Sequence, residues 1–399
     1  MAFGLRFIWL TALLVTLALW TRAPCATAAV AVASCKTHVV GEGHSLWKIA
    51  RRYNVSVEAI REQNGIEDAS ALRVGQVLDI PQRSGRCRRP RGNGDHAPAA
   101  AAGTTSDRPV VAPPPAWTQT QKTAAERGVN PCMTPDPGWG VYDTWSRAPS
   151  MGQMIAPQRG GISRSGAFDV MFHFHGHEPV RKEWVKVMDG AVLVGIDLGI
   201  GSGPYDQAFA VPARFGELVR SVEHAMAEKT GNSRAHVRKV GLSAWSAGYG
   251  AVGRILSQPQ GKRLVDTVVL LDGLHCGYQG KSLDETQLGP FIQFAQQAAA
   301  GRKLMVVSHS SIIPPGYAST TETAHFLIQK VGGRPRGVRP RGSDPMGLEL
   351  ISRYSRGSLH VRGYKGNDKM DHCAHIGLFK DILKVHVKRR WGSPRGRSR

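Results

Sequence analysis

The residue in this sequence best placed for covalent chemistry is Ser246, in the segment Ala244-Trp-Ser-Ala-Gly248. An apolar run, 237–242, precedes it, and a helix-compatible stretch, 249–256, follows it. A serine on a sharp strand-to-helix turn can be an exposed nucleophile, and small residues two positions before and after it let the two backbones approach closely. Ala244 stands where this pattern usually has glycine. Ser243 lies within the predicted strand, so we predict Ser246 to be the nucleophile.

A second strand-like run ends in a histidine-rich turn. Residues 168–174 are largely apolar and lead into His175-Gly-His177. Acyl transfer requires preorganised N–H donors for the negative charge that develops in the transition state. We predict these donors to be the backbone N–H groups of His177 and Ala247. For the imidazoles of His173 and His175 we expect a stabilising or substrate-facing role.

A serine hydroxyl also needs a general base, and the base needs an orienting acid. Two histidines, His372 and His375, follow the last predicted strand. The acid is either Asp272, at the end of the apolar run 268–271, or Glu322, before a helical stretch. We favour Asp272 because it stands directly at a strand end. Either choice gives the chain order serine, acid, histidine.

Residues 131–391 alternate strand-like runs with helical patterns, which predicts an α/β fold: a mostly parallel sheet with helices on both faces. Binding sites in such sheets form at the carboxyl ends of strands, where these candidates fall. The predicted strands are 168–174, 191–196, 237–244, 267–271, 304–308 and 359–363. The predicted helices are 212–229, 249–256, 291–300 and 321–330.

This combination of turn, chain order and topology resembles the α/β-hydrolases. The run His375-Ile-Gly-Leu-Phe resembles the histidine loop of small bacterial lipases, which favours His375 as the base and leaves His372 as the alternative. The resemblance implies hydrolysis of an ester, thioester or amide through an acyl-enzyme. It calls for no cofactor, and we predict no metal site.

The pattern of residues 37–81 predicts a self-contained β-α-α-β unit. Leu46, Ile49, Ala50 and Tyr53 recur at helical spacing, and 75–80 is a closing strand. The segment resembles the LysM domain over essentially its full length. That resemblance implies binding of peptidoglycan, chitin or another polymer containing N-acetylglucosamine. The implied contacts are Gly43, Ser45, Leu46, Ile66 and Leu72.

The flanking segments indicate export. Residues 1–33 combine Arg6, an apolar run over 7–20 and small residues, which is typical of a cleaved signal peptide and leaves no membrane span. Residues 82–125 form a basic linker rich in Pro, Ala and Arg, and 392–399 a basic tail. An oxidising compartment permits disulfides, for which we predict Cys35–Cys87 and Cys276–Cys373, with Cys132 left over.

The sequence therefore predicts an exported, LysM-tethered serine hydrolase of the bacterial cell envelope, periplasmic or extracellular and associated with the wall. Its partners would be peptidoglycan or a related polymer and a small ester or amide. The formal net charge of +22 favours anionic partners, but no aromatic module accompanies it and nucleic acid is not expected. The alternative is a non-catalytic peptidoglycan-binding protein with a degenerate hydrolase scaffold.

Overall fold

The computed structural model divides the chain into two compact units, Met1–Ala100 and Ala101–Arg399. It describes residues 36–81 and 116–392, with gaps at 42–45, 54, 56, 67–74, 129, 134–145, 148–150, 158–160, 189, 315, 341 and 343. The predicted signal peptide, most of the predicted linker, residues 393–399 of the tail, and the pair Cys35–Cys87 lie outside these residues.

The smaller unit has the predicted β-α-α-β order: β1 (Lys36–Val39), α1 (Leu46–Tyr53), α2 (Val57–Asn64) and β2 (Val77–Ile80). The two strands pair antiparallel. One apolar side of α1 is buried because Leu46, Ile49 and Ala50 recur at helical spacing and pack against Ile60 and Leu78. Asn64 joins α2 to β2, donating to and accepting from the backbone of Asp79.

The larger unit contains a ten-stranded sheet in the order β12-β13-β14-β11-β8-β7-β5-β6-β4-β3. The six central strands are parallel to one another, in the order β14-β11-β8-β7-β5-β6. The outer pairings on both sides are antiparallel. The strands are β3 (Ser146–Arg147), β4 (Gln153–Ile155), β5 (Ala167–Phe174), β6 (Val192–Ile196), β7 (His236–Trp245), β8 (Val265–Leu271), β11 (Leu304–Ser310), β12 (Arg336–Gly337), β13 (Leu350–Arg356) and β14 (Leu359–Tyr364).

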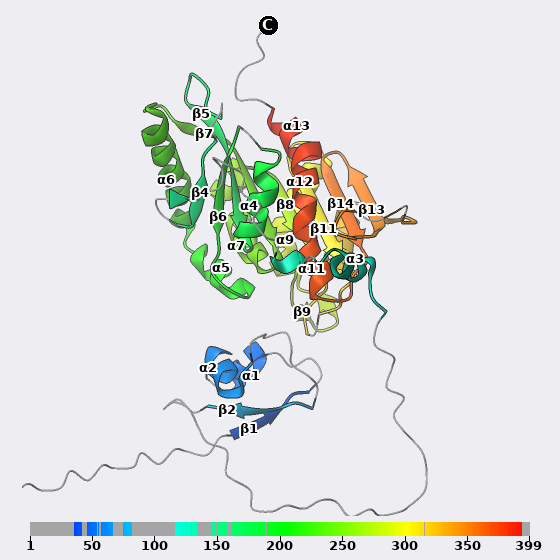
Figure 1. Cartoon of the computed structure of the whole chain (residues 1–399). Helices are drawn as coiled ribbons and strands as arrows, with labels where there is room; N and C mark the ends of the chain where they lie inside the picture. The colour runs from blue at the N-terminus through cyan, green and yellow to red at the C-terminus, as the bar shows by residue number, and fades with distance from the viewer. Residues whose placement is uncertain are drawn as a thin grey trace, which may run out of the picture. The chain divides into compact units, whose positions relative to one another are not determined.

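Helices cover both faces of this sheet (Figure 1) because successive strand residues point to opposite faces. In β8, Val268 and Leu270 join one buried cluster, whereas Val269 and Leu271 join the other. The first cluster lies under α5 (Ser202–Ala208), α6 (Pro212–Thr230), α7 (Tyr249–Ser257), α9 (Glu285–Ala299) and α10 (Thr320–Lys330). The second lies under α4 (His177–Val185), α12 (Phe379–Ile382), η5 (Leu383–Val387) and α13 (Lys388–Trp391).

All six predicted strands and all four predicted helices of this unit are present. The remaining short elements are η1 (Pro131–Met133), η3 (Ser246–Gly248), α8 (Pro259–Leu264), β9 (Tyr278–Gln279), β10 (Ser282–Leu283), α11 (Lys369–Ala374) and η4 (His375–Leu378). Strand β13 was not predicted, because its polar sequence near the sheet edge lacks the apolar run of a buried strand. Among the described residues, no helix is both long enough and apolar enough to cross a bilayer.

One prediction about the start of this unit is wrong. Residues 119–125, assigned to the linker, belong to the helix α3 (Gln119–Arg127), which begins with a capping box formed by Thr118 and Gln121. The Thr118 hydroxyl donates to Asp371 at 2.7 Å and so fixes α3 to α11.

The predicted Cys276–Cys373 disulfide is also wrong. Cys373 is bonded to Cys132, with the two Cα atoms 5.0 Å apart. Cys276 is a free thiol that packs in the first core cluster and is 2% exposed. The residue that seemed left over therefore makes the bond, and it ties η1 to α11.

Candidate active site

Ser246 occupies the turn between β7 and α7, as predicted from its neighbours. Its φ angle is 48°, in the left-handed region that non-glycine residues rarely adopt. A side chain at Gly248 would clash with the backbone of Phe174 in β5, which explains the small residue two positions after the serine. Strained backbone of this kind persists where surrounding structure holds it, often at functional sites. Ser243 is fully buried and bonds His173 instead.

Asp272 follows β8 directly and is fully buried, with φ at 44°. Its Oδ1 accepts hydrogen bonds from the Ser310 backbone N–H at 2.7 Å and from the Thr320 hydroxyl at 2.6 Å. Burial alone would raise the pKa of this carboxyl, but the nearby rings of His375 and His372 and hydrogen bonds from His372 and Thr320 lower the pKa overall. The group is therefore a carboxylate at neutral pH.

The histidine that pairs with Asp272 is His372. Its Nδ1 lies 2.7 Å from Asp272 Oδ2. The ring stacks on the indole of Trp245 with centroids 4.9 Å apart, and Trp245 Nε1 donates to the His372 carbonyl oxygen at 3.1 Å. Because the side chain is 22% exposed, the imidazole can meet a bound molecule.

His375, the residue favoured by the sequence, is placed differently. It lies one helical turn further along, at the start of η4, where the chain turns into the second core cluster. Its ring is fully buried, and its Nδ1 lies 2.9 Å from the hydroxyl of Ser308. Burial lowers its pKa to about 4, so the ring is neutral at neutral pH. The structure does not bring His375 to the pocket that contains Ser246.

Glu322, the alternative acid, is engaged at the beginning of α10. One carboxylate oxygen accepts from the backbone N–H and the hydroxyl of Ser319 at 2.8 and 2.7 Å, which completes a capping box. The other accepts from the Tyr278 hydroxyl at 2.8 Å. This carboxylate therefore stabilises a helix end and does not contact His372 or His375.

The turn expected to supply an oxyanion donor is held from two sides. His175 and Gly176 have φ angles of 69° and 71°. From one side, Nε2 of the buried His173 donates to the His175 carbonyl oxygen at 2.7 Å. From the other, Asp197 accepts from the Gly176 backbone N–H at 3.2 Å.

The two predicted donors stand at helical starts beside this turn: His177 begins α4, directly after the left-handed Gly176, and Ala247 is the second residue of η3. A side chain on Gly176 would press against the Trp245 ring, with its Cβ 2.8 Å from the nearest ring carbon. The turn, Trp245 and the start of η3 are thus closely packed. Within the described residues, no three His, Cys, Asp or Glu side chains gather in a way that would hold a metal ion.

A pocket of about 210 Å³ joins the elements of the site. It opens where β7, β8 and β11 end and α11 begins. It is lined by Ser246, Asp272, His275, Ser310, Ile312, Pro314, Tyr317, Thr320, Asp368, Lys369 and His372. The structure therefore brings Ser246, Asp272 and His372 to one cavity.

Two residues of this region were missed from the sequence. Trp245 lies between two imidazoles, His175 with ring planes 8° apart and His372 with ring planes 30° apart. Asp197 ends β6 and accepts from Gly176, Gly199 and the Tyr205 hydroxyl. The criterion that selected Asp272, a carboxylate directly after a buried strand, would also have selected Asp197.

The sheet topology, the serine turn after β7 and the Ser–Asp–His chain order give the larger unit the architecture of an α/β-hydrolase. Residues 38–81 match the LysM domain family, so the chain contains a LysM domain. A stretch of 45 residues is 47% identical to N-acetylmuramoyl-L-alanine amidase XlyA of Bacillus subtilis (strain 168). This match covers 11% of the chain and 15% of the amidase, well under two thirds of that relative's length.

Solved structures similar to the chain include the LpqC poly(3-hydroxybutyrate) depolymerase from Bordetella parapertussis, at 12% identity and a TM-score of 0.34, covering 67% of this chain and 94% of that one. An S-formylglutathione hydrolase from Agrobacterium tumefaciens is 11% identical with a TM-score of 0.34, covering 62% and 94% of the two chains. The esterase Est2 from the Planctomycetes species Thermogutta terrifontis is 14% identical with a TM-score of 0.34, covering 58% and 85%.

Proposed function

We propose that the protein is a serine hydrolase whose catalytic residues are Ser246, His372 and Asp272. The observation that carries the proposal is the 2.7 Å contact between His372 Nδ1 and Asp272 Oδ2 beside a cavity that Ser246 also lines. A buried carboxylate accepting from Nδ1 fixes the imidazole tautomer that leaves Nε2 as a base. His372 is thus preferred over His375, and Asp272 over Glu322.

The reaction follows from these protonation states. Ser246 Oγ attacks the carbonyl carbon of the substrate while His372 Nε2 removes the hydroxyl proton. The imidazolium donates to Asp272 through Nδ1 and then delivers the proton to the leaving oxygen or nitrogen as the carbonyl–leaving-group bond breaks. Water, deprotonated by the same Nε2, releases the acid from the acyl-enzyme and restores the serine proton.

The oxyanion donors in this proposal are the backbone N–H groups of Ala247 and His177. Support comes from the double attachment of the 175–177 turn by His173 and Asp197. A turn fixed before the substrate arrives needs no reorganisation as charge develops, which is the property that makes such donors effective.

The pocket favours a small acyl group. Its volume of about 210 Å³ is below the roughly 300–1,000 Å³ of pockets that enclose drug-sized ligands. Ile312, Pro314 and Tyr317 supply its apolar lining. We infer an ester or amide with a short acyl chain as substrate, cleaved without a cofactor.

We further propose that the LysM domain holds this hydrolase at peptidoglycan or another polymer containing N-acetylglucosamine, in the periplasm or at the cell wall after export. Tethering raises the effective concentration of the enzyme near wall-bound substrate. Of the glycan contacts expected from the sequence, Gly43, Ser45 and Leu72 lie outside the described residues. The Leu46 side chain is 2% exposed and packs in the domain core, and Ile66 packs beside that core.

A fluorophosphonate probe tests the nucleophile and the base together. We expect labelling of the wild type and of Ser243→Ala, none of Ser246→Ala, and slow labelling of His372→Gln. Equal labelling of all four would refute the assignment, and no labelling of any folded protein would favour the non-catalytic alternative. Pull-down on purified peptidoglycan and on chitin tests the tether separately, with residues 82–399 as the control that should not bind.

A further inference from the structure

Three arginines form a row across the antiparallel edge of the sheet. Arg336 in β12 lies directly opposite Arg353 in β13, and Arg353 lies directly opposite Arg362 in β14. Directly opposed residues project to the same face, so the three arginines follow one another across strands that lie about 4.8 Å apart. Figure 1 shows β13 and β14 beside the C-terminal helices at this edge.

No carboxylate among the described residues forms a direct ion pair with this arginine row. Arg336 and Arg353 are exposed, and none of the three makes an ion pair there. Arg362 donates a hydrogen bond to the Tyr364 hydroxyl, and the carboxylates of Asp344 and Asp381 lie near enough to raise the pKa of that hydroxyl. Like charges directly opposite one another on a sheet are destabilising, so the free protein maintains an unfavourable arrangement.

Two imidazoles lie beside the arginine row. His360, next to Arg362 on the same face, stacks on His386 of η5 with centroids 4.1 Å apart. Burial, His360, Arg362 and Arg389 together lower the pKa of His386 to about 4. Both rings are therefore neutral at neutral pH, and the positive charge beyond the row is that of the exposed Arg389.

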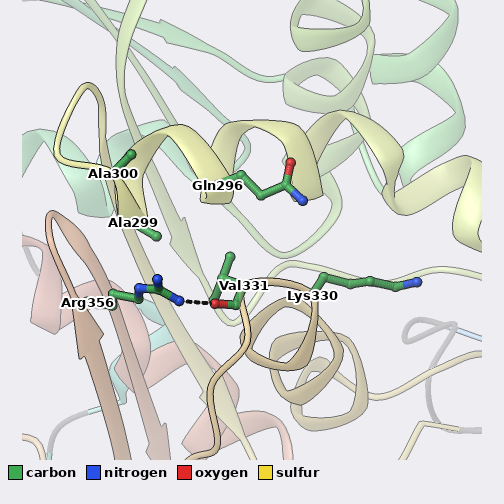
Figure 2. A pocket seen from close by; sticks show the side chains of 6 residues that line it. All are labelled: Gln296, Ala299, Ala300, Lys330, Val331 and Arg356. Carbon is green, nitrogen blue, oxygen red and sulfur yellow. Dashed lines mark hydrogen bonds between the residues drawn. The ribbon is translucent and has the colours of Figure 1, made fainter.

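The opposite face of the same edge carries a cavity of about 260 Å³ between α9, α10 and β13 (Figure 2). Its cations are already engaged. Arg356 donates to the Val331 carbonyl oxygen, and Lys330 pairs with Glu285 at 2.9 Å. This cavity therefore lacks the unpaired donors that distinguish the arginine row.

We propose that the arginine row is a binding site for an extended polymer that carries phosphate groups. Guanidinium groups bind phosphate oxygens through two parallel hydrogen bonds, which selects arginine over lysine for this purpose. A polymer lying across β12, β13 and β14 meets one guanidinium per strand and relieves their mutual repulsion. Such a contact would be a second attachment, independent of the LysM domain and of the hydrolase site.

Protection of the sheet edge is the competing explanation, because charged residues on an edge strand prevent pairing with other chains. One charge on β12 would suffice for that role. Edge protection gives no reason for arginines at the opposed positions of β13 and β14, where the strands are already paired.

The test uses the full chain and two variants of equal net charge. The first carries Arg336→Gln, Arg353→Gln and Arg362→Gln. The control carries Arg214→Gln, Arg220→Gln and Arg263→Gln at exposed helical positions. Binding of fluorescent inorganic polyphosphate is followed by anisotropy between low and moderate salt, with anionic phospholipid vesicles and single-stranded DNA as parallel probes.

We expect the row variant to bind polyphosphate about ten-fold or more weakly than wild type, with the slope of log affinity against log salt reduced by about 2 to 3. The control should change affinity less than about three-fold. Equal losses in both variants would reduce the effect to overall charge and refute the site. Binding of vesicles through the row, with no binding of polyphosphate or DNA, would also refute an extended phosphate polymer as its ligand.

A single substitution provides a second test, which does not depend on whether the triple variant folds. Removing the central charge with Arg353→Gln should leave the unfolding midpoint unchanged or raise it by about 1 to 3 °C, because two opposed pairs are relieved. Added polyphosphate should raise the midpoint of wild type more than that of Arg353→Gln. A large fall in the midpoint of Arg353→Gln would show that the row supports folding and would contradict the proposal.

Discussion

The substitution His375→Phe separates the two histidines that the sequence offered as the base. His375 is fully buried beside Ser308 and outside the pocket, whereas His372 contacts Asp272 at its edge. Phenylalanine keeps a planar aromatic ring, somewhat larger than imidazole, and has no ring nitrogens. We therefore expect ester hydrolysis per folded molecule to stay within about three-fold of wild type, whereas His372→Gln should lose about 10⁴-fold or more, as when a triad base is removed.

The structure also sets the effect of His375→Phe on stability at neutral pH. The Ser308 hydroxyl is buried and loses its partner, at a cost of about 1–3 kcal/mol in the free energy of unfolding. Combining the change with Ser308→Ala removes the orphaned hydroxyl. The double variant should therefore recover much of this loss.

A pH titration gives a second, independent signature. The pKa of His375 is about 4 in the folded protein, whereas the ordinary pKa of a histidine side chain is 6.5. Between these values the unfolded chain binds more protons, so stability falls as the pH falls from 6.5 to 4. The full effect is about 3 kcal/mol at about 1.4 kcal/mol per pKa unit. His375→Phe should make the acid limb of stability against pH shallower by about this amount.

The assays are hydrolysis of a short-chain chromogenic ester and urea unfolding between pH 4 and 7.5. Buried His173 and His309, whose pKa values burial lowers to about 3, retain their own acid sensitivity in every variant. The reasoning fails if folded His375→Phe loses hydrolysis a hundred-fold or more while His372→Gln keeps it. An unchanged acid limb in His375→Phe would show that the ring is not buried in its neutral form.

Three further changes probe neighbouring contacts. Asp272→Asn should lower kcat by about 10³- to 10⁴-fold in a chain that still folds, because an amide no longer fixes the His372 tautomer; activity near wild type would remove Asp272 from the mechanism. Trp245→Leu takes away the ring and Nε1–H that hold His372, so kcat should fall about ten- to hundred-fold with the fluorophosphonate still reacting; an unchanged kcat would show that the stack does not position His372. Cys132→Ser removes the disulfide to Cys373, 241 residues away, and should lower the free energy of unfolding by about 2–5 kcal/mol. Equal thermal midpoints of the wild-type protein with and without reductant would contradict this.

Much of the fold could be read from local patterns. Buried parallel strands appear as short apolar runs, and amphipathic helices repeat at helical spacing, so both are visible within one segment. The strand β13, next to the edge of the sheet, and the helix α3 were not predicted. The first is polar because it lies near the edge of the sheet, and the second was hidden in a polar, proline-containing region and is secured by the distant residue Asp371.

The sequence by itself determined the serine turn, the strand-end carboxylate and the chain order, because each depends on a residue and its immediate neighbours. It could not choose between His372 and His375, or pair Cys373 correctly. Those outcomes depend on which side of α11 and η4 faces the cavity and which faces the core, and on where α3 and η1 are held. Only packing between segments that lie 67 to 241 residues apart in the chain decides such orientations. For that reason the tertiary structure places the buried imidazole at Ser308 and the pocket-facing one at Asp272.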